Sequence, residues 1–128
     1  MALSVTSDGE AKVAKVSLKE GKSLFARKEY QKSIGEFLKG LNGDPESDDA
    51  LAAMADLMEA YANLSDTTRV RMMSYYIGER FRGKPDAAQA LFRTGRYYLD
   101  MTNRPMYEFV YKVCLTNFPE HPQAVNIL

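Results

Sequence analysis

The chain has 128 residues, of which 45% are hydrophobic and 27% charged, and this composition is typical of one ordinary globular domain. Its one cysteine and one histidine exclude a disulfide framework, a multi-cysteine zinc site and a two-histidine metal motif. Seventeen basic and seventeen acidic side chains cancel, so no strong net field attracts nucleic acid or a membrane surface. We therefore expect no catalytic residues, no metal and no cofactor.

The first twenty residues contain no apolar stretch of signal-peptide length, and no later stretch approaches the length of a membrane span. We expect a cytoplasmic protein without membrane insertion, and an unpaired Cys114 suits a reducing compartment. The charges are distributed unevenly, since residues 44–66 carry seven acidic side chains and no basic one. Both flanking segments are net basic, which indicates either an acidic middle hairpin in solvent or a surface for a partner of mixed charge.

Capping and breaking residues divide the chain into six predicted helices, and no β-hairpin signal appears. A capping box at residues 7–10 opens the first helix, and Ser47 and Asp66 supply caps for the third and fourth. Apolar residues at helical spacing support the first two helices. The expected ranges are 10–27, 30–42, 50–63, 67–82, 86–101 and 105–117. The expected apolar positions of the first helix are Val13, Val16, Leu24 and Phe25, and those of the second are Tyr30, Ile34, Phe37, Leu38 and Leu41.

The six helices suggest an internal repeat of helix pairs. The shift that places Gly21 on Gly95 also places Phe37 on Tyr111 and Pro45 on Pro119. The middle helix pair fits less well at a shift of 37 residues, half of the 74 that separate Gly21 from Gly95. The three stops at Pro45, Pro85 and Pro119 are 40 and 34 residues apart.

The residues Gly21, Leu24, Tyr30, Phe37 and Pro45 together resemble the tetratricopeptide repeat (TPR), a helix–turn–helix unit of about 34 residues. The resemblance implies an all-α, right-handed α-solenoid of three antiparallel hairpins, in which a small residue in each first helix lets the second pack closely. The implied organisation is an N-terminal arm at 1–9, repeats at 10–45, 48–85 and 86–119, and a tail or partial capping helix at 120–128.

In such arrays the first helix of each hairpin lines a concave groove, and the resemblance implies which residues face it. An alanine floor would lie between two walls that each combine an aromatic ring with a cation, suited to an apolar side chain flanked by carboxylates. The expected groove residues are Lys15, Leu18, Lys22, Phe25, Ala55, Glu59, Ala62, Gln89, Phe92, Arg93, Arg96 and Leu99, with Ala52 beside them. The simpler alternative is that Glu59 bridges Lys22 and Arg96 while the aromatic rings pack between repeats.

These expectations predict a non-enzymatic scaffold or adaptor that binds a peptide segment of a protein partner. A carboxylate clamp of the kind found in some TPR co-chaperones is not expected, because Leu18 and Ala55 stand where polar groups would be needed. A dimeric assembly or secretion chaperone is an open alternative, with Val125, Ile127 and Leu128 as contacts. An RNA-binding helix over residues 69–84 is a weaker one.

Four clustered methionines and the lone cysteine complete the predictions. Met54, Met58, Met72 and Met73 fill the core or form an adaptable apolar surface. Cys114 occupies a small-residue position within the sixth helix, which favours a buried, inert thiol.

Overall fold

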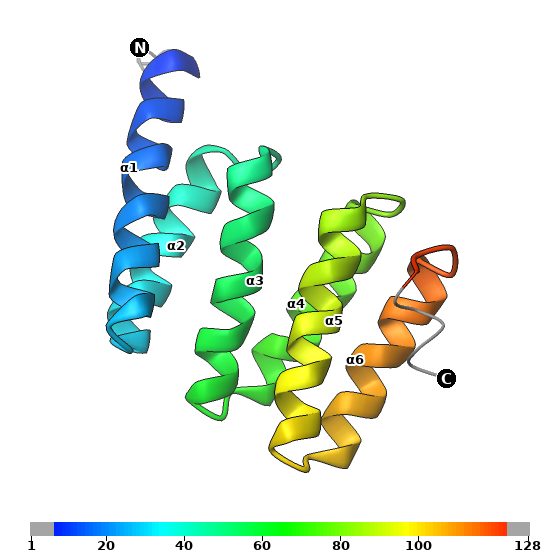
Figure 1. Ribbon diagram of the computed structural model, residues 1–128. Helices are drawn as coiled ribbons and strands as arrows, with labels where there is room; N and C mark the ends of the chain where they lie inside the picture. Colours follow the sequence, from blue (N-terminus) through cyan, green and yellow to red (C-terminus); the bar gives the residue numbers. More distant parts are fainter. Residues whose placement is uncertain (1–6, 123–128) are drawn as a thin grey trace. The chain divides into compact units, whose positions relative to one another are not determined.

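The computed structural model describes residues 7–122 and shows six α-helices and no strand in that range (Figure 1). The prediction of an all-α chain is therefore confirmed. Residues 7–9, predicted as part of the N-terminal arm, are instead the first residues of α1, and the rest of that arm lies outside the described residues. The predicted tail or partial capping helix is described only over residues 120–122, which are not helical, and Val125, Ile127 and Leu128 lie outside the described residues. The helices are α1 Ser7–Ala26, α2 Tyr30–Gly43, α3 Asp48–Asn63, α4 Thr67–Arg80, α5 Pro85–Asp100 and α6 Arg104–Asn117.

The chain forms two compact units that divide between Leu64 and Ser65, inside the range predicted for the middle hairpin. In the first unit α1 and α2 pack side by side and run antiparallel, and α3 packs against both and runs in the direction of α1 (Figure 1). In the second unit α6 packs against α4 and α5, with α5 antiparallel to both.

Glycines set the distance between the paired helices of the first unit. A Cβ on Gly21 would lie 2.6 Å from the ring of Phe37, which is almost fully buried. A Cβ on Gly40 would overlap Leu18 and lie 3.0 Å from the carbonyl oxygen of Ala14. Because neither glycine carries a side chain, α1 and α2 approach closely enough for Phe37 and Leu18 to pack on the opposite backbone.

The second unit repeats these contacts in the register that places Gly21 on Gly95. A Cβ on Gly95 would overlap the ring of Tyr111, as Gly21 would meet Phe37. The thiol of Cys114, at the position of Gly40, lies 3.8 Å from the carbonyl oxygen of Ala88, the counterpart of Ala14. The prediction that Gly21 and Gly95 admit a closely packed second helix is confirmed within each unit.

Corresponding helix boundaries recur at one constant interval. Helices α2, α4 and α6 begin at residues 30, 67 and 104 and end at residues 43, 80 and 117, an interval of 37 in each case. Helices α3 and α5 begin at residues 48 and 85. The left-handed residues Lys28, Ser65 and Thr102, with φ of 63°, 61° and 55°, follow the same interval.

The helix boundaries recur at equal intervals although the three prolines are unevenly spaced. Pro45 and Pro119 follow the ends of α2 and α6, whereas Pro85 is the first residue of α5. Proline suits both places, since it cannot continue a finished helix and its fixed φ suits a first turn. The three prolines thus mark two different points of the repeat.

The predicted caps are present where their side chains are described. The Ser47 hydroxyl accepts a hydrogen bond from the Ala50 N–H at 3.0 Å, and the Asp66 carboxylate accepts one from the Arg69 N–H at 3.2 Å. Asn103 caps α6 in the same way at 3.3 Å. The predicted capping box at 7–10 depends on side chains that are not described. Helix α4 ends at Arg80, two residues earlier than expected.

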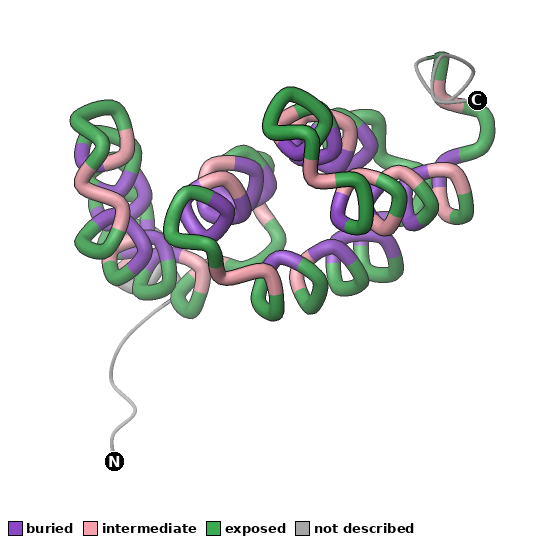
Figure 2. The backbone as a smooth tube through the Cα atoms, turned by 90° about the horizontal axis from the view of Figure 1, so that it is seen from below, coloured by how far each residue is buried: buried purple, intermediate pink, exposed green. Residues whose placement is uncertain are grey.

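Burial corrects part of the predicted apolar face. Each helix buries one face and exposes another (Figure 2), and Leu24, Ile34 and Phe37 are buried as expected. Val13 and Val16 instead lie 67% and 69% exposed on α1. Their counterparts on α3, at the same interval, are Ala50 and Ala53, which are buried as α3 packs on the α1–α2 pair. In the first unit no described helix covers the same face of α1.

Some of the clustered methionines fill the core and one lies on the surface, so each of the two interpretations holds for part of the cluster. Met54 and Met58 are buried on α3, whereas Met72 is 65% exposed on α4. Cys114 is a free, buried thiol, as predicted.

Candidate functional site

A groove of about 260 Å³ runs between α1 and α3 in the first unit. Three residues predicted to line a binding groove, Lys15, Leu18 and Lys22, form its α1 side, and Ala52 lies on the α3 side. The sequence reasoning missed the other members, which are Lys19, Phe37, Asp49, Ala53 and Asp56. Tertiary packing brings these five together, because α2 and α3 both pack against α1.

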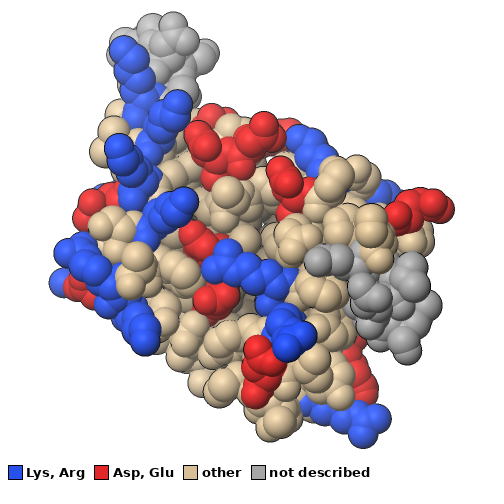
Figure 3. Space-filling view, in the orientation of Figure 1, with Lys and Arg blue, Asp and Glu red and all other residues tan. Residues whose placement is uncertain are grey.

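The two walls of the groove carry opposite charge. Lys12, Lys15, Lys19 and Lys22 recur at spacings of three and four positions, which places them along one face of α1, and all four are exposed. Within the described residues, none of these lysines has an ion pair within 4.0 Å. Asp49 and Asp56 stand on the α3 wall. Figure 3 shows the basic row along α1 and acidic atoms over the beginning of α3.

The base of the groove is apolar. Leu18, Phe37 and Ala53 are buried, and the exposed methyl group of Ala52 lies at the surface beside them. Gly21 gives the Phe37 ring its place, since any side chain there would displace the ring. The groove thus combines an apolar base with lysines free to meet carboxylates and with aspartates that can meet cations or N–H donors.

The remaining predicted groove residues of the first unit are less accessible. Phe25 is half-buried and packs edge-on against Tyr30, with ring centroids 5.7 Å apart. Ala55 and Ala62 are buried, and Glu59 is half-buried. Of the predicted alanine floor, only Ala52 is exposed.

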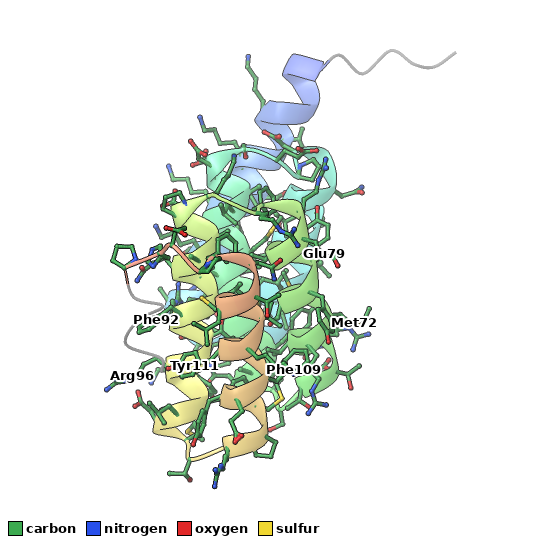
Figure 4. All side chains as sticks on the ribbon, turned by 90° about the vertical axis from the view of Figure 1, so that its right-hand side faces the viewer. Met72, Glu79, Phe92, Arg96, Phe109 and Tyr111 are labelled. Atoms are coloured by element: carbon green, nitrogen blue, oxygen red, sulfur yellow. The ribbon has the colours of Figure 1, made fainter. Side chains whose placement is uncertain are left out.

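In the second unit the predicted residues lie along α5. Phe92 is half-buried against Tyr111, with ring centroids 5.8 Å apart, and the Arg96 Nε donates to Asp100 Oδ1 at 3.1 Å. Leu99 is 39% exposed, Gln89 is exposed and Arg93 is half-buried. Figure 4 shows Phe92 and Arg96 on one side of α6 and Met72 and Glu79 on the other.

A second cleft, of about 190 Å³, lies between α4 and α6 on the side of Met72. Tyr75 and Phe109 meet edge to face in it, with ring centroids 5.2 Å apart, and the Arg71 guanidinium lies 5.6 Å from the Phe109 centroid. Lys112, Val113, Thr116 and Asn117 complete the lining. Sequence reasoning missed this cleft, because Tyr75 and Phe109 are distant in the sequence and only the α4–α6 contact joins them.

The basic residues of the segment 69–84 do not form a continuous open surface. Arg69 pairs with Asp66 at 2.7 Å, the Arg82 guanidinium donates to Asn117 Oδ1 at 2.8 Å, and Lys84 lies over the Phe81 ring. The Arg69 contact also holds the pKa of the Asp66 carboxyl below its usual value. These contacts give the RNA-binding alternative no support.

Buried titratable groups in the second unit are held in their neutral forms. Burial raises the pKa of the Cys114 thiol to about 11 and that of the Tyr98 hydroxyl to about 12. A thiol with such a pKa is a poor nucleophile at neutral pH, because little thiolate is present.

In the described range, no group of three or more His, Cys, Asp or Glu side chains is arranged to hold a metal ion. Over residues 7–122, no helix combines the length and apolar character needed to cross a bilayer.

Comparison with protein-family models, with curated proteins and with solved structures finds no significant match to this chain. Its function is therefore inferred from the residues and contacts described above.

Proposed function

We propose that this protein is a non-enzymatic adaptor of TPR-like helix pairs that binds a peptide segment of a partner protein in the α1–α3 groove. The groove supports this by joining an apolar base to a row of lysines that has no ion-pair partner among the described residues. Burying apolar surface supplies affinity, and the charged walls select and orient the bound segment.

The proposed architecture is a right-handed solenoid of three helix pairs. Its support is the constant interval of the helix boundaries, together with the shared packing of Gly21 on Phe37 and of Gly95 on Tyr111. The interval is slightly longer than that of an ordinary TPR, so we describe the repeat as TPR-like.

The middle pair of this proposed array would exchange the sizes of two residues. At the interval of the helix boundaries, Met58 takes the place of Gly21, and Ser74 takes the place of Phe37. The middle repeat therefore lacks the glycine and the aromatic residue that identify the other two repeats in the sequence.

In the proposed complex an apolar side chain of the peptide rests on Leu18 and Ala52. Carboxylates beside it meet Lys15, Lys19 or Lys22, and cationic or N–H groups meet Asp49 on the facing wall. The opposed walls thereby fix which way round the segment lies, because reversing it would place like charges together.

The test uses peptides selected from a random display library against the immobilised whole chain, with affinity measured by fluorescence anisotropy. Ala52→Trp fills the groove from an exposed position and should weaken binding at least tenfold, while circular dichroism and the melting temperature stay unchanged. Lys39→Glu, on exposed α2 outside the groove, is the matched surface control and should bind as wild type. A library that yields no binders, or one in which every selected peptide binds the Ala52→Trp variant normally, would contradict the proposal.

A further inference from the structure

The outward side of α4 exposes large apolar side chains beside the α4–α6 cleft. Met72 is 65% and Tyr75 56% exposed, and their spacing of three positions places them one turn apart on the same face of α4. At the interval of the helix boundaries, the matching positions of α2 are Gly35 and Leu38, and those of α6 are Phe109 and Lys112. Solvent contact alone does not favour methionine and tyrosine at such positions, and exposed apolar patches commonly mark interaction sites.

The cleft has a fixed shape. Tyr75 and Phe109 hold each other edge to face, and Gly78 lets α4 approach α6 so closely that a Cβ there would lie 2.6 Å from Asn117 Nδ2. Asn117 donates to the Val113 carbonyl at 2.9 Å and accepts from Arg82 at 2.8 Å. A ligand entering this cleft would therefore meet preorganised walls and would lose little binding energy in ordering them.

The charges around the cleft are basic. Lys112 lines it, Arg71 lies over Phe109, and no carboxylate is among its lining residues in the described chain. Glu79 stands further along α4 than Met72, on the same side of the helix (Figure 4). Lys112 is exposed and has no ion pair among the described residues.

We propose that the α4–α6 cleft is a second docking site, which takes an acidic protein segment carrying one leucine or aromatic side chain. The volume of about 190 Å³ suits one such side chain between Tyr75 and Val113, and neighbouring carboxylates meet Lys112 and Arg71. This site lies in the second unit and shares no lining residue with the α1–α3 groove of the first.

Two other occupants fit the observations less well. A second copy of this chain would bring its own Arg71 and Lys112 to the interface and set like charges together. An RNA base needs an open ring face for stacking, whereas Arg71 and the edge-on Tyr75 pair already occupy the surroundings of the Phe109 ring.

The test measures anisotropy with fluorescein-labelled peptides selected from a random library by the whole chain carrying Ala52→Trp, which blocks the first groove. We expect selected peptides to be rich in Asp or Glu around a Leu, Phe or Trp. Thr116→Trp fills the cleft from an exposed position and should weaken peptide binding at least tenfold. Lys112→Glu should weaken peptide binding about tenfold. Replacing the peptide acids by lysine should restore binding to the Lys112→Glu variant. Lys32→Glu on α2 is the charge-matched control and should leave affinity unchanged.

Several outcomes would overturn this second site without touching the first. These are an absence of binders to the Ala52→Trp chain, selected peptides without acidic enrichment, and binding that Thr116→Trp leaves intact. Displacement of the peptides by an oligouridine would assign the cleft to RNA. Light scattering that shows a dimer, dissociated by Thr116→Trp, would assign it to a second copy.

Discussion

Two glycines decide how closely the paired helices approach. Gly21 faces the buried ring of Phe37, and Gly95 faces the half-buried ring of Tyr111. A third glycine, Gly35, lies on the exposed side of α2, and a Cβ there would meet no atom within 4 Å. The same residue type thus has opposite effects at these positions, because only the first two stand between packed helices.

Alanine substitution at the three glycines should separate these roles. Gly21→Ala should lower the free energy of unfolding by about 1–3 kcal/mol, because the Phe37 ring cannot leave the core. Gly95→Ala should cost less, because Tyr111 can move toward solvent. Gly35→Ala should raise stability by about 0.5–1 kcal/mol through helix propensity alone. Urea unfolding measures all three, and a Gly21→Ala variant as stable as Gly35→Ala would refute this packing.

At the scale of elements, the first helix of each unit's hairpin ends in the same turn. Lys28 and Thr102 adopt the left-handed conformation, and the residues after them, Glu29 and Asn103, donate to the carbonyls of Leu24 and Tyr98 at 2.9 Å. This six-residue hydrogen bond is the Schellman termination, which usually places glycine at the left-handed position. Here lysine and threonine occupy it, so the turn is formed against local preference and is held by packing of the two helices.

Placing glycine in this turn should therefore stabilise the protein. Thr102→Gly should raise the free energy of unfolding by roughly 0.5–1 kcal/mol, because a β-branched residue at φ 55° is strained. The control removes a glycine from a left-handed position. Gly83 has φ 88°, and a Cβ built there meets no atom within 4 Å, so a substitution changes the backbone strain without creating a clash. Gly83→Ala should lower stability by about 1 kcal/mol through strain alone. Thermal unfolding checks the pair, and a destabilised Thr102→Gly would mean that the threonine side chain contributes more than its strain costs.

At the scale of the whole molecule, the constant interval of the helix boundaries predicts that the chain can be lengthened by one further repeat. Repeat arrays gain stability from each unit and from each interface between neighbours, so an added repeat in phase is tolerated. A second copy of residues 48–84, inserted after Lys84, restores every helix boundary in order and opens α5 again at its proline.

The lengthened chain should fold with helix content in proportion to its length and with stability at least equal to wild type. A copy limited to residues 48–81 lacks the connection before α5 and is the matched control, which should lose cooperative unfolding. Far-ultraviolet circular dichroism and urea titration distinguish the two. An aggregated or unfolded chain from the in-phase insertion would argue against an array.

Local signals in the sequence determined much of this protein. Ser47 and Asp66 mark helix starts because a cap acts on the nearest turn of backbone, and all six predicted helices are present in the described residues. The small residues at 21 and 95 were also identified correctly, since the shift that superposes them aligns their aromatic partners as well. Proline was the exception, because it suits both a helix start and the stretch after a helix end.

Only the tertiary structure decided which faces meet and which stay open. Val13, Val16 and Tyr75 have the residue types of core positions, yet they are exposed, because burial depends on whether another helix covers the face. The same holds for the two candidate sites. The lysine row on α1 follows from helical spacing, but Asp49, Asp56 and Phe37 reach it only through the packing of α2 and α3. Tyr75 and Phe109 form one cleft because two distant helices lie side by side, and spacing along a single helix carries no information about that contact.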